Sequence, residues 1–256
     1  VDQRYRSPIV PGVLTLELFF NKKPTTVLVI PLLLFIATSW QVQHFSEKFC
    51  SKKVSLLCIC IFIILPTVRY WGQMAMTDVP VTGIWFFGLI LLIYSDRHPT
   101  NNKLTFILGA SIGLLFLTKY TFVYMLGLVG WFILNDLNLK RILFFLLGWF
   151  TICSPFLIHN FLLHGNPLSP LSRQVYFAKE STISTMGAHT GMSFINDIVI
   201  NLNYLFVFCS LMGLLFLCLK KVRDIKPILV FTIPLLILNG IILDWGEPRY
   251  NIPLLV

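Results

Sequence analysis

Apolar runs long enough to cross a membrane recur along this chain, and short polar loops separate most of them. A spanning helix needs roughly 20 residues, with about 17 as a practical minimum once flanking residues are counted. The apolar cores occupy residues 27–43, 54–68, 79–94, 104–118, 120–134, 141–158, 202–219 and 227–243. Charged residues make up only 12% of the chain, whereas a soluble domain carries roughly a quarter. We therefore predict an all-α polytopic membrane protein with about eight transmembrane helices, in a single transmembrane domain over residues 1–256.

The stretch 104–134 allows either one long helix or two shorter ones. One helix would be about 46 Å long, at about 1.5 Å per residue, against a hydrocarbon core of about 30 Å. Its middle, Thr118-Lys119-Tyr120-Thr121, is polar. Both points favour two helices, and the charge of the loops provides a separate test.

Loop charge supports two helices, because the cytoplasmic loops of membrane proteins carry an excess of Lys and Arg. With two helices, the loops that share one side are 43–53, 95–103, 135–141 and 220–226. Counted after Val27, they hold eleven basic residues against four in the opposite loops, leaving Lys119 aside, whereas one helix reduces the split to eight against seven; Lys22 and Lys23, before this point, lie on the opposite side and mildly oppose the rule. We therefore predict that these four loops are cytoplasmic. The opposite side carries Asp78, Lys119, the long loop 159–200 and residues 244–250.

The two ends of the chain carry expectations of their own. Residues 9–20 are apolar but too short to span, and they contain Glu17, so we expect an interfacial N-terminal helix. The chain begins at Val1 rather than Met, and a new apolar run opens at Leu254. We therefore expect a fragment of a longer protein, with sequence missing at both ends.

Several kinds of function find no support in the composition or the motifs. The net charge of +9 is scattered between apolar runs, so a loop bias explains it better than a nucleic-acid partner. The six cysteines lie in or beside apolar runs without metal-ligand spacing, and we interpret them as small buried side chains. His159 and His164 are five residues apart, which suits no shared helical face, so no metal site is expected. No cofactor is firmly implied, and a need for a divalent metal stays open.

Polar residues of an unusual kind gather on the side opposite the basic loops. Asp78, Lys119, Glu247 and Arg249 all lie at ends of apolar runs on that side, where they can line a shared cavity. Arg and Lys suit phosphate oxygens, and carboxylates suit sugar hydroxyls or act as bases. Structural alternatives stay open: Asp78 as a helix N-cap, Lys119 as a solvated turn residue, and Glu247 with Arg249 as a surface ion pair.

Four motifs, in order along the chain, resemble those of a known enzyme group. They are Met74-Ala75-Met76-Thr77-Asp78-Val79-Pro80, Gly109 to Leu117-Thr118-Lys119-Tyr120, His159-Asn160 with Gly165-Asn166-Pro167 and Pro170, and Glu247-Pro248-Arg249-Tyr250 with Pro253. The set resembles the GT-C superfamily of membrane glycosyltransferases. It is nearest to glycosyltransferase family 39, which includes protein O-mannosyltransferases and the aminoarabinose transferase that modifies lipid A. The likeness covers nearly the whole chain, and a GT-C-like helical fold is what it implies.

The resemblance implies an inverting transfer of a sugar from a polyprenyl-phosphate donor to a lipid, glycan or protein acceptor on the extracytoplasmic or lumenal face. The family's catalytic base is an acidic residue in the first outer loop, usually an Asp-Glu pair after a first helix. Asp2 stands in the corresponding loop, but Gln3 follows it where the family has Glu. The true base is therefore expected upstream of Val1.

The resemblance also implies roles for the remaining site residues. Arg249 would bind the donor phosphate with Tyr250 packed beside it, and Lys119 would neutralise phosphate charge. Glu247 and Asp78 would orient Arg249 or sugar hydroxyls. The supporting or sugar-binding residues of the outer loop would be His159, Asn160 and Asn166.

Two other classes of function stay open. A transporter or flippase for lipid-linked sugars would need polar groups along a path through the bilayer, and a non-catalytic assembly subunit would need no site at all. In each case the expected location is an integral membrane, the plasma membrane in a prokaryote or the endoplasmic reticulum in a eukaryote, with membrane lipids as neighbours. The sugar and the acceptor are not identified by these residues.

Overall fold

The computed structural model describes residues 29–64, 78–119 and 138–169, together with the single residues 172, 212 and 229. Within this part, the chain forms helices and no strands, as predicted. The helices are α2 (Val29–Ser46), α3 (Lys52–Ile64), α5 (Asp78–Arg97), α6 (Asn102–Thr118) and α8 (Leu139–His164). Each coincides with one predicted apolar run. The predictions for residues 1–26, 120–134, 202–219 and 227–243 lie outside the described residues.

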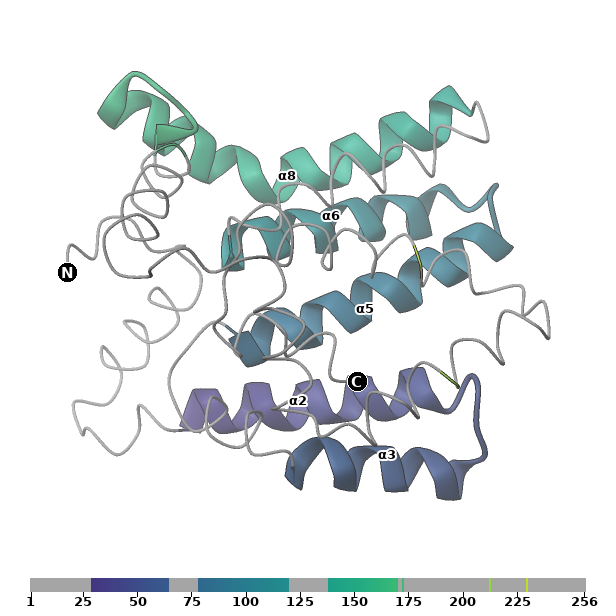
Figure 1. Ribbon diagram of the computed structural model, residues 1–256. Helices are drawn as coiled ribbons and strands as arrows, with labels where there is room; N and C mark the ends of the chain where they lie inside the picture. The colour runs from purple at the N-terminus through teal and green to yellow at the C-terminus, as the bar shows by residue number, and fades with distance from the viewer. Residues whose placement is uncertain are drawn as a thin grey trace.

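The five helices lie side by side in a row, in the order α3, α2, α5, α6 and α8 (Figure 1). At one edge of the row, α2 and α3 are antiparallel. The rings of Phe35 and Phe62 stack with their centroids 6.4 Å apart. Nearer the connecting turn, Ser55 Oγ donates a hydrogen bond to the carbonyl oxygen of Gln43 over 2.9 Å.

Helix α5 runs parallel to its neighbour α2. Thr38 of α2 lies against Gly83 of α5. Farther along both helices, the rings of Phe45 and Phe86 pack with their centroids 5.3 Å apart. The contacting residue numbers increase together along the two helices. The first residues of α2 and α5 therefore lie at the same end of the helix axes.

Helices α6 and α8, which are neighbours in the row, are also parallel. Gly109 of α6 lies against Phe145 of α8. Farther along, Cys153 Sγ donates to the carbonyl oxygen of Gly113 over 3.6 Å. The two helices therefore begin at the same end, and Lys119 and Asn138, which flank residues 120–137, lie at opposite ends.

A buried polar cluster joins three helix ends. Arg141 of α8 is fully buried, and its Nη2 donates to Ser95 Oγ of α5 over 3.1 Å. The Ser95 and Thr105 hydroxyl oxygens are 3.3 Å apart, which brings in the start of α6. Asn101 and Asn138 cap α6 and α8 by accepting backbone N–H bonds through their side chains. The end of α5 and the starts of α6 and α8 are therefore held together.

Because the five helices run along one another, their termini gather at two opposite ends of the helix axes, which we call the basic end and the distal end. The basic end contains the turns 47–51 and 98–101 and the start of α8 at Asn138. The distal end contains the start of α5 at Asp78, the end of α6 at Lys119 and the end of α8 at His164. Three of the four loops with predicted cytoplasmic charge thus lie at one end, and Asp78 and Lys119 lie at the other.

Helix α6 ends inside the stretch 104–134. Helix α6 ends at Thr118, and Lys119 has an extended backbone with φ −154° and ψ 109°. A single uninterrupted helix over 104–134 is therefore excluded, in agreement with the two-helix prediction.

Among the described helices, α8 is the one that is both long enough and apolar enough to cross a membrane, with 26 residues. Helix α6 is apolar but shorter, with 17 residues. Figure 1 shows that α8 bends near its middle, where Pro155 lies within the helix. A proline removes one helical hydrogen bond and displaces the preceding turn, which accounts for a bend at this place.

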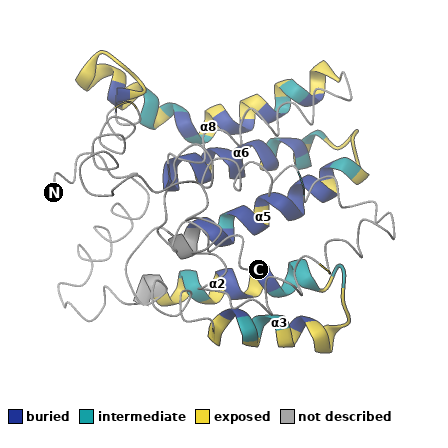
Figure 2. Cartoon of the chain, in the orientation of Figure 1, coloured by how far each residue is buried: buried dark blue, intermediate teal, exposed yellow. Residues whose placement is uncertain are grey.

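Burial is greatest in the middle of the row (Figure 2). Ten of the 17 residues of α6 are buried, whereas in α3, at the edge, only Ser55 and Phe62 are. Helices α6 and α8 approach each other closely because both carry glycine at the contact. A Cβ on Gly109 would overlap the Phe145 carbonyl oxygen, and one on Gly148 would overlap that of Phe106.

Candidate functional site

Lys119 is the charged candidate that the structure describes most fully. It caps the C-terminus of α6, and its backbone N–H donates to the Leu115 carbonyl oxygen over 3.0 Å. The residue is only 9% exposed. A cation at a helix C-terminus interacts favourably with the partial negative charge of the last carbonyls. A buried ammonium also requires polar or anionic partners nearby.

Asn160 lies near the end of α8 and holds the turn that follows the helix. The residue is 4% exposed, and its Nδ2 donates to the Pro167 carbonyl oxygen over 3.4 Å. This hydrogen bond ties the end of α8 to the turn that follows it. The interpretation of Asn160 as a supporting or a sugar-binding residue stays a prediction.

A turn at Gly165-Asn166-Pro167 follows α8. Gly165 has a left-handed backbone with φ 66°, and its N–H donates to the Phe161 carbonyl oxygen over 2.8 Å, which ends α8. This conformation favours glycine because it has no Cβ. Asn166 Oδ1 accepts a hydrogen bond from the Leu168 N–H over 2.9 Å. Asn166 itself is exposed, so the turn presents a polar, ordered surface at the distal end.

His159 and His164 are both exposed on α8. No group of three His, Cys, Asp or Glu side chains that could hold a metal ion occurs in the described ranges. The expectation about metal binding by the whole chain stays a prediction.

The register between the helices relates Lys119 to the other candidates. Gly109 faces Phe145, and Gly113 bonds to Cys153, so partners on α8 lie 36 to 40 positions after those on α6. By this offset, Lys119 is level with the turn of α8 that contains His159. Asn160 and the turn after α8 follow directly beyond the end of α6. Lys119 and the turn after α8 thus lie at the same, distal end of the described helices.

Asp78 is the first residue of α5 and also lies at this end. Its side chain is outside what the structure describes, so its interpretation as a helix cap or a sugar ligand stays a prediction. Asp2, Glu247, Arg249 and Tyr250 lie outside the described residues as well. The structure therefore places Lys119, the start of α5 and the end of α8 at one end of the described helices, and the predicted site itself stays a prediction.

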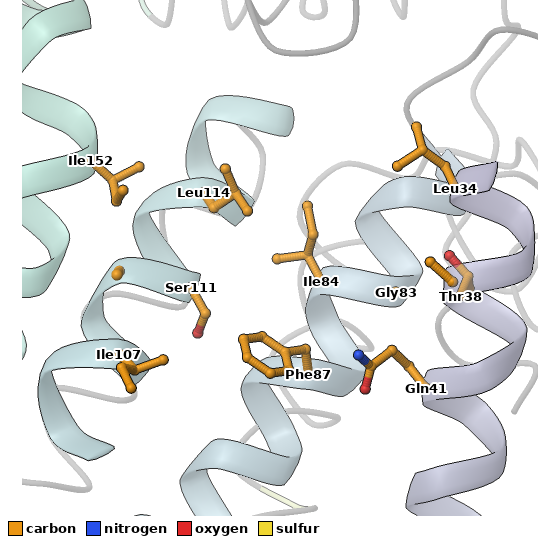
Figure 3. A pocket seen from close by; sticks show the side chains of 12 residues that line it. Leu34, Thr38, Gln41, Gly83, Ile84, Phe87, Ile107, Ser111, Leu114 and Ile152 are labelled. Carbon is orange, nitrogen blue, oxygen red and sulfur yellow. The ribbon is translucent and has the colours of Figure 1, made fainter. Parts of the chain in front are cut away.

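A groove in the middle of the row was not predicted from the sequence. We call it the central groove; it has a volume of about 380 Å³ and lies between α2, α5, α6 and α8 (Figure 3). Its walls are mainly apolar, with Ile84 and Phe87 of α5 between the α6 and α2 sides. Small residues on three neighbouring helices, Ala37, Gly83 and Ala110, leave the space open. These small residues are the one sequence signal, and it becomes readable only when the order of the helices is known.

Comparison with known proteins gives no relative. No family model, curated protein or solved structure matches the chain. A functional assignment therefore depends on the residues of the site and on the motif resemblance described above.

Proposed function

We propose that this chain is a membrane glycosyltransferase that moves a sugar from a polyprenyl-phosphate donor to an acceptor on the side of the membrane opposite the basic loops. The observation that carries the proposal is the position of Lys119. It is a buried residue at the distal end, the same end at which α5 begins with Asp78 and α8 ends in a polar turn. The motif resemblance gives this arrangement its chemical interpretation.

The charge of Lys119 suits the leaving group of such a reaction. As the bond between the anomeric carbon and the phosphate oxygen breaks, negative charge develops on the polyprenyl phosphate. A cation fixed at that place stabilises the transition state more than the ground state, and such preorganised charge is often the largest catalytic contribution. In this proposal Lys119 and Arg249 share that task, and Tyr250 packs beside Arg249.

The other residues have lesser roles in the proposal. Asp78 and Glu247 orient Arg249 or the sugar hydroxyls, and Asn160 with Asn166 keeps the turn after α8 in place beside the acceptor. An acidic base removes the proton of the attacking acceptor group, which contributes roughly 10² to 10⁴ in rate. Asp2 is only a weak candidate for that step, because Gln3 follows it where the family pattern has Glu.

The central groove supports a donor with a hydrocarbon tail. Its apolar walls offer no partners for a polar ligand beyond Thr38, Gln41 and Ser111. Ser111 Oγ already donates to the Leu108 carbonyl oxygen over 2.7 Å. A long isoprenoid chain is the part of the proposed donor that such a surface would accept.

Replacement of Lys119 tests the proposal. In membranes from cells that make the full chain, we expect Lys119→Gln to lower the rate of sugar transfer by about 10²-fold or more. Lys119→Arg should retain part of the activity because it keeps the charge. The measurement is transfer from labelled polyprenyl-phosphate mannose and polyprenyl-phosphate aminoarabinose, at matched protein amounts.

The matched control is Lys48→Gln, which removes a partly buried lysine at the basic end. It should leave the transfer rate unchanged. Undiminished transfer by Lys119→Gln would contradict the role of Lys119. Movement of the donor across the membrane without transfer would favour the flippase alternative, and neither activity would favour an assembly subunit.

A further inference from the structure

Four exposed lysines lie at the basic end of the row, one pair on α3 at one edge and the other pair on the neighbouring helices α6 and α8 at the other edge. We call this set, Lys52, Lys53, Lys103 and Lys140, the lysine surface. They come from the first turns of α3, α6 and α8, which are far apart in sequence. The cluster of Arg141, described above, fixes the start of α8 against the end of α5, so the lysines of α6 and α8 have a defined spacing.

The chain supplies little negative charge against this surface. None of the three helices has an acidic residue in its first turn. The first turn of a helix carries unpaired N–H groups and a partial positive charge, so acidic residues are favoured there and lysines are not. At the same end, Glu47 accepts a hydrogen bond from Gln43 Nε2 over 3.0 Å, and Asp96 is partly exposed. The described charges at this end therefore favour an external anion.

Exposed apolar side chains lie directly beside the lysines. Leu139 is 81% exposed and Leu143 is 56% exposed, next to Lys140 on α8. On α3, Val54 and Leu56 are exposed beside Lys52 and Lys53. Figure 2 shows exposed positions at the basic end of both α3 and α8. A soluble anion would satisfy the lysines and leave the apolar groups uncovered, whereas a phospholipid offers a phosphate and an acyl chain together.

We propose that the lysine surface binds the phosphate groups of anionic phospholipids in the leaflet that it faces. The lysines interact with the headgroups, and the exposed leucine and valine side chains below them contact the acyl chains. The partner is thus a lipid of a particular charge, and its binding does not depend on sugar transfer. The site lies at the end opposite Lys119, so the two activities can be measured separately.

The test uses the full chain in a neutral detergent, with fluorescent phosphatidylglycerol as the probe and the same label on phosphatidylcholine as the neutral comparison. We expect tighter binding of phosphatidylglycerol, weakened by raising the salt from 50 to 300 mM as electrostatic contacts are screened. Each lysine replaced by Gln should weaken the binding by about fivefold. Fluorescence anisotropy gives the dissociation constants for the wild type and for Lys103→Gln/Lys140→Gln.

The matched control is Arg173→Gln/Lys179→Gln, which removes the same charge from the loop predicted on the opposite side. It should bind phosphatidylglycerol like the wild type. Equal affinity for the two lipids, an unchanged double variant, an equal loss in the control, or full competition by soluble glycerol phosphate would each overturn the proposal. If Lys103→Gln/Lys140→Gln does not fold, Lys52→Gln/Lys53→Gln on the edge helix gives the same test.

Discussion

The α6–α8 pair and the α2–α3 pair hold their helices together in different ways. In the α6–α8 pair, Gly109 and Gly148 let one backbone lie directly against the other. In the α2–α3 pair, the Phe35 and Phe62 rings keep the backbones apart, and a single described side-chain hydrogen bond, from Ser55, crosses between them. Lipid tails are as apolar as leucine, so helices in a membrane associate through close packing and polar contacts. The comparison teaches that backbone overlap limits how closely α6 and α8 approach, whereas side-chain contacts set the approach of α2 and α3.

The largest expected effect is that of one added methyl group in the α6–α8 pair. Gly148→Ala places a Cβ against the Phe106 carbonyl oxygen, and a backbone oxygen cannot rotate away as a side chain can. We expect a loss of about 3 kcal/mol, at the upper end of the usual range for overpacking. Thermal unfolding in detergent measures it, with the exposed Leu147→Ala as the control. A loss no greater than that of the control would mean that the backbones are farther apart than described.

A smaller loss is expected when the α2–α3 pair loses its aromatic contact. Phe62 is 1% exposed and stacks on Phe35. We expect Phe62→Ala to cost about 2 kcal/mol, less than the ~3–5 kcal/mol typical of soluble cores, because lipid tails replace part of the lost contact. The same unfolding assay applies, and Leu57→Ala on the exposed face of α3 should have almost no effect. A cost for Phe62→Ala that exceeds that of Gly148→Ala would reverse the comparison.

The hydrogen bond across the α2–α3 pair should contribute less again. Ser55 is fully buried and donates to the Gln43 carbonyl oxygen of the other helix. We expect Ser55→Ala to cost about 1 kcal/mol. Ser39→Ala is the matched control, because Ser39 Oγ bonds to Phe35 of its own helix and crosses to no neighbour. Equal losses in the two variants would show that the contact between helices adds nothing.

The smallest expected effect concerns the rate of chemical labelling of Cys50, in the turn between α2 and α3. Partial burial, and to a lesser extent the nearby Cys58 thiol, raise the pKa of Cys50. The raised pKa keeps Cys50 mostly protonated at neutral pH, and the thiolate is the reactive form. Labelling by a membrane-impermeant maleimide should therefore be slow at pH 7 and rise about tenfold per pH unit up to the pKa. It should occur from the side of the basic loops, and labelling from the opposite side would contradict the predicted orientation.

The positions of the helices could largely be predicted from the sequence. The predicted core 104–118 corresponds to α6 at Asn102–Thr118, because an apolar run flanked by Asn and Lys marks both ends. The predicted core 141–158 was too short, since α8 continues through Pro155 as far as His164. Asn138 and Gly165, at the ends of α8, are the capping residues that would have given its true length.

The arrangement of the helices could not be predicted in the same way. The burial of Lys119 depends on what packs around the end of α6, and the central groove depends on which helices are neighbours. The local sequence around Gly109 and Gly148 does not show what these glycines pack against, because their contacts depend on the register of two separate helices. Of the candidate site, the sequence therefore indicated the common end but not the contacts that Asn160 makes there.

The parallel packing of α6 and α8 has a consequence for the making of the protein. Gly109 meets Phe145, which is synthesised 36 residues later. At roughly 5–20 residues per second, α6 waits about 2 to 7 s for this partner. During that interval its glycine face is available to any other helix with small residues that is inserting nearby. The rate of translation between these two residues thus becomes a determinant of correct assembly.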